Sequence, residues 1–248
     1  MRVTVLGASA TYPSPASPAS GYLLRHGETS IWLDAGSGTF AALQRYVSPK
    51  SLTALFLSHQ HADHCVDAIG LFYALRHGSV NREPITVYCP DAVAGTLGRF
   101  VDVENGAFED VATFCDPTGL GDVTVDGLRL TFAEMNHPVP TLGLRAESNG
   151  TSFVYTADTG PSDHLVEFAA GADVLLAEAT YQGASAEKPW PHHLTAGEAG
   201  QLARAAGARK LVLTHIWPEF DPDRSLWEAG EEFGGDVALA VPDATFDI

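Results

Sequence analysis

The sequence predicts an α/β protein in which mixed β-sheets are covered by helices. Short β-branched or aromatic-rich segments, bounded by Gly, Pro or Asp, alternate with longer helix-like stretches. Their order is not a strict alternation, because hairpin-like pairs of strands open the chain and recur near its middle. With 248 residues, of which 45% are hydrophobic and 18% charged, the chain can build a sizeable core.

The expected elements follow from the spacing of apolar residues. Helix 196–206 has the clearest boundaries, because Thr195 and Glu198 form the T-x-x-E pattern of a capping box and Gly207 supplies a stop. We see no internal repeat or boundary, so we expect residues 1–248 to form a single domain. The expected strands are 3–6, 22–25, 30–33, 54–57, 85–88, 128–132, 142–145, 152–156, 174–177, 211–214 and 237–240. The expected helices are 39–47, 63–77, 91–100, 162–170, 196–206 and 224–233.

Charge and cysteine content restrict the partners and the location that we expect. The formal net charge of −17 repels polyphosphate backbones and the basic residues are scattered, so we expect a small substrate and no extended nucleic acid. The 3 cysteines form no C-x-x-C pair, which indicates a reducing, cytoplasmic location. We expect no signal peptide and no membrane association, because no apolar run approaches the roughly 18 residues that span a bilayer.

A histidine-rich segment follows strand 54–57 and points to a metal site. Residues 59–64 read H-Q-H-A-D-H. Residues two apart in an extended segment share a side, so His59 and His61 can bind one cation. Asp63 and His64 then begin a helix and face a second position. Neutral imidazoles with a carboxylate suit zinc or another first-row divalent metal.

Three later strands also lead into a residue that can bind metal. His137 comes soon after strand 128–132, Asp158 follows strand 152–156, and His215 follows strand 211–214. A site built at one edge of packed sheets requires this pattern. We therefore expect these side chains to join the first cluster.

The H-x-H-x-D-H run, with a later His, an Asp and a terminal His, resembles the metallo-β-lactamase superfamily. The resemblance covers nearly the whole chain. It implies an αββα sandwich of two mixed β-sheets with helices on the outer faces and two divalent metal ions between the sheets, with zinc, manganese or iron as candidates. It also implies two groups of three ligands and one bridging carboxylate. These are His59, His61 and His137 for one metal, Asp63, His64 and His215 for the other, and Asp158 as the bridge. No cysteine falls in the ligand pattern, which disfavours a lactamase.

Several segments resemble the ribonuclease Z-like branch of that superfamily. In that branch a His before the capped helix reaches toward the scissile phosphate, and an acidic residue orients it. Here these residues would be His193 and Glu178, and a His–Glu pair also suits proton donation to a leaving alkoxide. The similar segments are 6–9, the Pro-rich loop 10–20, 20–24, the E-A-T-Y of 178–181 and the H-L-T-A-G-E-A of 193–199.

Two departures argue against processing of transfer RNA. Ribonuclease Z carries a long arm between its ligand His and its bridging Asp, but here the interval from His137 to Asp158 holds only a simple hairpin. The residues after His215 read Ile-Trp-Pro-Glu, whereas ribonuclease Z has a Ser and an Arg there. The chain most resembles actinobacterial members of this branch that hydrolyse 3′,5′-cyclic nucleotides such as cyclic AMP.

The resemblance thus implies a metal-dependent phosphodiesterase for a small molecule. Asp63 and Asp158 would orient the attacking water, and His193, positioned by Glu178, would protonate the leaving 3′-oxygen. Relatives of this branch are often dimers, which implies a homodimer. A ribonuclease, a lactonase, a phosphodiesterase for another cyclic phosphate and a non-catalytic metal-binding relative remain alternatives. Phe72, Tyr73, Trp190 and Trp217 are candidates for stacking on a base.

Overall fold

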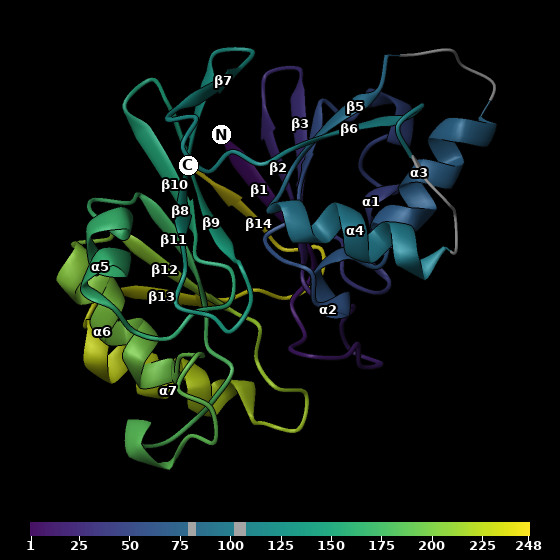
Figure 1. The fold of residues 1–248 in the computed structure, drawn as a ribbon. Helices are drawn as coiled ribbons and strands as arrows, with labels where there is room; N and C mark the ends of the chain where they lie inside the picture. The colour runs from purple at the N-terminus through teal and green to yellow at the C-terminus, as the bar shows by residue number, and fades with distance from the viewer. Residues whose placement is uncertain (79–82, 102–107) are drawn as a thin grey trace.

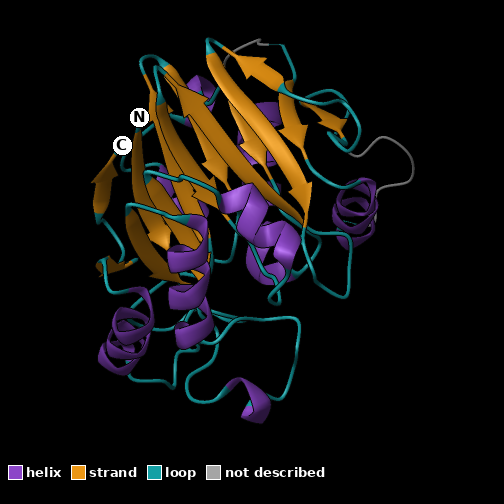
Figure 2. Cartoon of the chain, turned by 90° about the vertical axis from the view of Figure 1, so that its left-hand side faces the viewer, coloured by secondary structure: helices purple, strands orange, loops and turns teal. Residues whose placement is uncertain are grey.

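A computed structural model describes residues 1–78, 83–101 and 108–248 of the chain. Within these residues the strands form two seven-stranded sheets (Figures 1 and 2). The first sheet has the order β14 (Thr245–Asp247), β1 (Arg2–Gly7), β2 (Gly21–His26), β3 (Thr29–Leu33), β4 (Ala54–Phe56), β5 (Ile85–Tyr88) and β6 (Ala112–Cys115). The second has the order β13 (Asp236–Leu239), β12 (Lys210–Thr214), β11 (Val174–Glu178), β10 (Thr151–Tyr155), β9 (Leu142–Ser148), β8 (Leu128–Glu134) and β7 (Val123–Val125).

Both sheets are mixed, as the sequence predicts. In the first sheet β1, β2 and β3 pair antiparallel, and β3 to β6 pair parallel. In the second sheet β7 to β10 pair antiparallel, and β10 to β13 pair parallel. Because parallel strands end at the same edge, the residues that follow β10, β11 and β12 meet along one edge of the second sheet.

Helices cover the outer face of each sheet, and apolar side chains fill the layers between them. The first sheet carries α1 (Thr39–Leu43), α3 (Ala68–His77) and α4 (Asp91–Phe100), and the second carries α5 (Asp163–Ala169), α6 (Ala196–Ala206) and α7 (Pro222–Phe233) (Figure 1). Tyr22, Phe56 and Phe153 belong to the apolar layer between the sheets. The resulting order of helices, sheet, sheet and helices confirms the predicted αββα sandwich. No helix among the described residues is both long and apolar enough to cross a membrane.

The prediction of one continuous helix over 63–77 is wrong, because this segment forms two helices, α2 (Ala62–Cys65) and α3. Asp67 lies at the break. Its N–H donates to the carbonyl of Ala35 at 2.8 Å, and its side chain accepts from the N–H of Phe40 at 2.8 Å. These tertiary contacts replace a helical hydrogen bond, which the apolar spacing alone does not reveal.

Helix α6 and the interval before Asp158 agree with the sequence-based expectations. The Thr195 side chain accepts from the N–H of Glu198, whose carboxylate accepts from the N–H of Thr195, and Gly207 ends the helix at φ 64°. Between residues 137 and 158, β9 and β10 form an antiparallel hairpin. Three strands were not predicted: β6, β7 and β14 are only three or four residues long, and tertiary pairing rather than a local pattern defines them.

Candidate metal centre

The residues expected to bind metal come together at one end of the two sheets. His59 follows β4 of the first sheet, whereas His137, Asp158 and His215 follow β8, β10 and β12 of the second. Their donor atoms form clusters whose members lie within 4.8 Å of one another. The clusters include every ligand candidate from the sequence: His59, His61, Asp63, His64, His137, Asp158 and His215.

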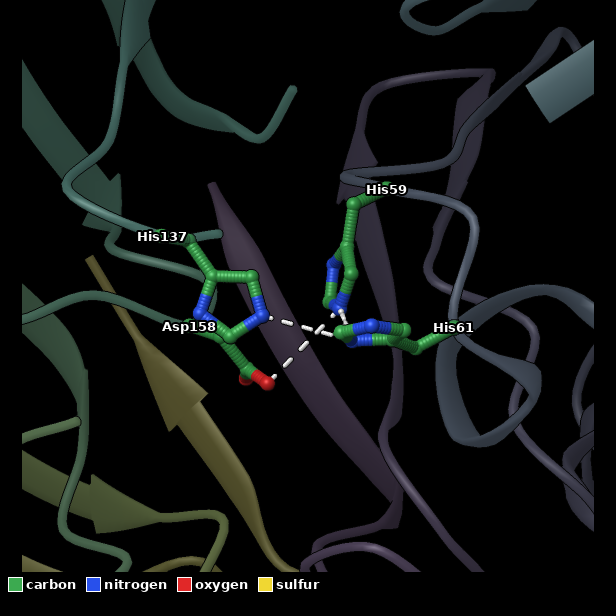
Figure 3. A group of neighbouring side chains, drawn as sticks. All are labelled: His59, His61, His137 and Asp158. Carbon is green, nitrogen blue, oxygen red and sulfur yellow. Dashed lines mark hydrogen bonds and ion pairs between the residues drawn. The ribbon is translucent and has the colours of Figure 1, made fainter. Parts of the chain in front are cut away.

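The first cluster contains His59, His61, His137 and Asp158 (Figure 3). His61 Nδ1 lies 2.9 Å from His59 Nε2 and 3.3 Å from His137 Nε2. His59 Nε2 lies 3.7 Å from Asp158 Oδ2. Two donors that bind one zinc ion at about 2.0–2.1 Å with tetrahedral geometry would be about 3.3 Å apart. The spacing in this cluster therefore suits a shared cation.

The second cluster contains Asp63, His64 and His215. His215 Nε2 lies 3.3 Å from His64 Nε2 and 3.4 Å from Asp63 Oδ2. Asp158 adjoins this cluster too, because its Oδ1 lies 3.2 Å from His64 Nε2 and 3.5 Å from His215 Nε2. Asp158 thus presents one carboxylate oxygen to each cluster, which is the arrangement that a bridging ligand needs.

Hydrogen bonds behind the clusters orient the imidazole rings. His59 Nδ1 donates to Ser58 Oγ at 2.9 Å, and His64 Nδ1 donates to Asp34 Oδ2 at 2.7 Å. Ser58 Oγ in turn donates to Asp34 Oδ2 at 2.8 Å. A neutral imidazole that donates through Nδ1 keeps the Nε2 lone pair available for a metal. The buried Asp34 was missed in the sequence, although it too follows a strand directly, β3.

The same arrangement recurs on the second sheet. His215 Nδ1 donates to Thr180 Oγ1 at 2.8 Å, and Thr180 Oγ1 donates to Glu178 Oε2 at 2.6 Å. His137 Nδ1 donates to the carbonyl of His192 at 3.3 Å. Thus all the histidines that direct Nε2 into the centre have a hydrogen-bond acceptor at Nδ1. Metal-binding histidines need this second contact, so the donor set fits a metal.

The charge of the centre also fits bound cations. Asp34, Asp158 and Glu178 are buried, and among the described residues all of their ion-pair partners are histidines. Asp158 Oδ1 is buried and accepts no hydrogen bond from any residue that the structure describes. Buried carboxylates without a compensating charge are costly, so divalent cations would stabilise the folded centre.

Neighbouring groups shift the pKa values of the histidines in opposite directions. Burial lowers the pKa of His59 and lowers that of His137 to about 4, which keeps both rings neutral. Burial also acts to lower the pKa of His64, but the carboxylates of Asp158, Asp63 and Asp34 outweigh it and raise that pKa well above its ordinary value. These carboxylates therefore stabilise a positive charge beside His64 Nε2, which is the position that a metal cation would occupy.

Strained backbone surrounds the centre. Asp34, Ala157 and His215 have φ values of 54°, 53° and 53°, in the left-handed region that residues other than glycine rarely adopt. Thr11, at φ 63°, lies in the Pro-rich loop, and its N–H donates to Asp63 Oδ2 at 2.8 Å. The loop thus contacts the site, and this hydrogen bond orients a candidate ligand.

His193 and Glu178 form a pair beside the two clusters. His193 Nδ1 donates to Glu178 Oε1 at 2.9 Å and lies 4.0 Å from Asp158 Oδ2. The His193 ring stacks on that of His215, with the ring centroids 5.7 Å apart. Burial acts to lower the pKa of His193, but the charge and hydrogen bond of Glu178 outweigh it and raise the pKa to about 9. The ring is therefore charged at neutral pH and can donate a proton.

Only two of the four candidate stacking residues lie at the site. Trp190 and Trp217 line a cavity of about 540 Å³, and His193 and Asp158 belong to the same lining. The expectation is wrong for Phe72, which is fully buried in the core beneath the first sheet's helices. The expectation has no support for Tyr73 either. This residue does not line the cavity, and its ring stacks on His77 of the same helix.

Comparison with known proteins places the chain in a family. Residues 29–216 match the family model described as the beta-lactamase superfamily domain. The protein Rv1339 of Mycobacterium tuberculosis is 40% identical over 254 residues, which cover 100% of this chain and 92% of that protein. Ribonuclease Z of the archaeon Natronomonas pharaonis is 27% identical over 303 aligned positions, which cover 100% of this chain and 98% of that enzyme.

A relative of similar fold comes from Bacillus subtilis. The probable metallo-hydrolase YhfI is 31% identical over 97% of both chains. Its crystal structure matches with a TM-score of 0.87, at 29% identity over 99% of this chain and 98% of that one. Human tRNase Z, short form, has the same fold, with a TM-score of 0.80 at 23% identity over 100% of this chain and 99% of that one.

Proposed function

This chain belongs to the metallo-β-lactamase superfamily, in its ribonuclease Z-like branch, and we propose that it hydrolyses a small phosphodiester. The substrate that we propose is a 3′,5′-cyclic nucleotide such as cyclic AMP. The family supports a metal-dependent hydrolase. The observation that carries the choice of a phosphodiester is the His193–Glu178 pair next to Asp158, because an alkoxide leaving group requires a proton donor.

We propose that two divalent cations occupy the centre, with zinc as the first candidate and manganese or iron as alternatives. When bound, they would lower the pKa of water and stabilise negative charge on the phosphoryl oxygens. His59, His61 and His137 would hold one cation, Asp63, His64 and His215 the other, and Asp158 would bridge them.

The protein's own side chains would position water and move the proton. Asp63 and Asp158 would accept hydrogen bonds from the attacking water, and the Thr11 N–H directs the Asp63 carboxylate. His193 would donate the proton on Nε2 to the leaving 3′-oxygen, while Nδ1–H stays bonded to Glu178. Glu178 would thereby keep the ring oriented and stabilise its charged form.

The main alternative is a ribonuclease Z-like endonuclease. The alignment with ribonuclease Z extends over 303 positions, so that enzyme carries segments that this 248-residue chain lacks. The interval before Asp158 holds only the β9–β10 hairpin, and the net charge of −17 opposes binding of a polyphosphate. These observations favour a small substrate. Another metallo-hydrolase activity, such as that of a lactonase, and a non-catalytic metal-binding relative are the further alternatives.

A panel of substrates tests the proposal. The purified protein, loaded in turn with zinc, manganese or iron, is assayed with cyclic AMP, cyclic GMP, precursor transfer RNA and a lactone. We expect release of a nucleoside 5′-monophosphate from a cyclic nucleotide and loss of this activity with a chelator. Cleavage of the transfer RNA or the lactone alone would overturn the proposed substrate class, and no turnover with any metal would favour a binding role.

We also propose that residues 1–248 act as one domain and form a homodimer. The candidate ligands come from both sheets, so neither sheet supplies the centre without the other. Light scattering during gel filtration would determine the mass, and a monomer at all concentrations would overturn the dimer.

A further inference from the structure

The cavity over the candidate metal centre has an aromatic wall, formed by Tyr181, Trp190 and Trp217, and lacks basic side chains among the described residues. Among the described residues, no lysine or arginine lines it. Beyond the candidate ligands and His193, the lining consists of Thr11, Ala62, Tyr181, Pro189, Trp190 and Trp217. A charged group of the substrate would therefore bind only at the metal centre. The remainder of the substrate would contact mainly the aromatic side chains.

The aromatic side chains stand next to the proposed proton donor. Tyr181 stacks on Trp217, with ring centroids 6.1 Å apart and ring planes 28° apart. The Tyr181 ring also meets His193 edge-on, with a centroid distance of 5.9 Å. Trp190 is 57% exposed, so its ring is open to a ligand in the cavity that it lines. The wall therefore adjoins the position where His193 would meet the substrate.

Positive charge for a phosphate would have to come from the metal centre, because no basic side chain among the described residues lines the cavity. If bound, divalent cations held by Asp63, Asp158 and the surrounding histidines would supply this charge to the phosphate group that is cleaved. A second phosphate would need a further cation, but the lining has none and the whole chain carries a net charge of −17.

We propose that Trp190, Trp217 and Tyr181 bind one planar ring of the substrate, and that the site selects a phosphodiester with no second phosphate. This inference rests on the proposed function and deepens it, because it specifies what flanks the scissile group. A nucleobase meets the requirement, since stacking of a base on an aromatic side chain is worth about 1–3 kcal/mol. Longer nucleotides with further phosphates would bind less tightly.

A binding experiment tests this inference without turnover. Tryptophan fluorescence of the metal-loaded protein is titrated with adenosine 5′-monophosphate, ribose 5-phosphate and adenosine 3′,5′-bisphosphate. We expect saturable quenching by the first, and dissociation constants at least about tenfold higher for the second, which has no ring, and for the third, which has a second phosphate. Trp190→Ala and Trp217→Ala should each raise the first constant about tenfold, whereas Trp190→Phe should keep most of the affinity.

Trp227→Ala is the matched control, because Trp227 is 64% exposed on α7 and does not line the cavity. This variant should bind adenosine 5′-monophosphate like the parent protein. Unchanged affinity in both Trp190→Ala and Trp217→Ala would overturn the aromatic wall, and tighter binding of the bisphosphate would overturn the selection against a second phosphate. If the nucleotide binds as expected but no phosphodiester is cleaved, the wall stands and the proposed function fails.

Discussion

Asp34 accepts hydrogen bonds from four groups in the interior of the molecule. The donors are the N–H and Oγ of Ser58, His64 Nδ1 and the hydroxyl of Tyr155. Two of these contacts orient His59 and His64, one through Ser58 and one directly. The arrangement of the candidate ligands therefore depends on a carboxylate that does not reach the cations itself.

Replacement of this carboxylate should weaken metal binding. In Asp34→Asn one acceptor oxygen becomes a donor, so His64 or Ser58 loses its partner. We expect metal affinity to fall about 10- to 100-fold, measured by competition with a chromophoric chelator. Asp247→Asn, at a side chain 74% exposed, is the control and should bind like the parent. An Asp34→Asn protein of unchanged affinity would show that Asp34 has no positioning role.

Replacement of His193 should lower the rate of hydrolysis and leave the metal content unchanged. We expect His193→Ala to lower kcat on a cyclic nucleotide about 10²- to 10⁴-fold, because the leaving oxygen loses its proton donor. Elemental analysis should find the same metal content as in the parent. His192→Ala is the control, since the substitution keeps the backbone carbonyl that accepts from His137 and removes only a side chain that bonds to Asn136. Full turnover by His193→Ala would rule out the proposed acid.

The raised pKa of His193 also predicts how the stability of the metal-free protein depends on pH. The folded chain binds this proton more tightly than the unfolded chain, so the contribution is complete below about pH 6.5 and is lost as the pH rises to about 9. The full contribution is on the order of 3 kcal/mol. Urea unfolding should show that the parent loses more stability than His193→Gln between pH 6.5 and 9, and parallel curves would contradict this.

At the scale of elements, the segment before α6 holds His193 through a buried ion pair. Lys188 Nζ donates to the carbonyl of His193 at 2.9 Å and to the Glu198 carboxylate at 2.7 and 2.9 Å. Both side chains are at most 8% exposed. Because Glu198 also closes the capping box of α6, the helix start and the proposed proton donor share one structural support.

Breaking this pair should destabilise the fold. Lys188→Met leaves Glu198 buried without its cation, and we expect the free energy of unfolding to fall by about 3 kcal/mol. The double variant Lys188→Met/Glu198→Gln should recover much of that loss, because no charge then remains unpaired. Urea denaturation measures both. If Lys188→Met alone were as stable as the parent, the pair would have no structural role.

At the scale of the whole molecule, the candidate centre joins the two sheets. His59, His61, Asp63 and His64 come from the segment after β4, whereas His137, Asp158 and His215 come from the second sheet. Bound cations would therefore link the two halves of the sandwich. Binding to the folded state alone stabilises it by about 2.7 kcal/mol when free metal is at 100 times the dissociation constant.

Removal of metal should accordingly lower the melting temperature. For a chain of 248 residues we expect a decrease of about 5–10 °C on treatment with a chelator, recovered when zinc or manganese is added back. His215→Ala is the control, because a chelator should shift its melting temperature less than that of the parent. Identical melting curves with and without chelator would argue against a stabilising metal.

The sequence by itself determined the class of fold and the set of candidate ligands. Apolar periodicity locates most of the strands, and the ligand candidates form a short local run or lie within a few residues of a strand end, so both are visible in neighbouring residues. Helix 63–77 and the missed β6, β7 and β14 show the limit of this approach, because tertiary hydrogen bonds define the ends of these elements.

Only the tertiary structure decided which ordinary residues support the centre. The strand-end position of Asp34 and the place of Thr180 in the E-A-T-Y segment do not reveal their partners, and Lys188 has no local pattern; each acts through partners that chain folding brings close. The same holds for the aromatic residues, since Trp190 lies at the cavity and Phe72 in the core although both are large apolar rings. A local pattern reports the chemistry of a side chain and its face on one element, whereas its neighbours across the fold depend on how the elements pack.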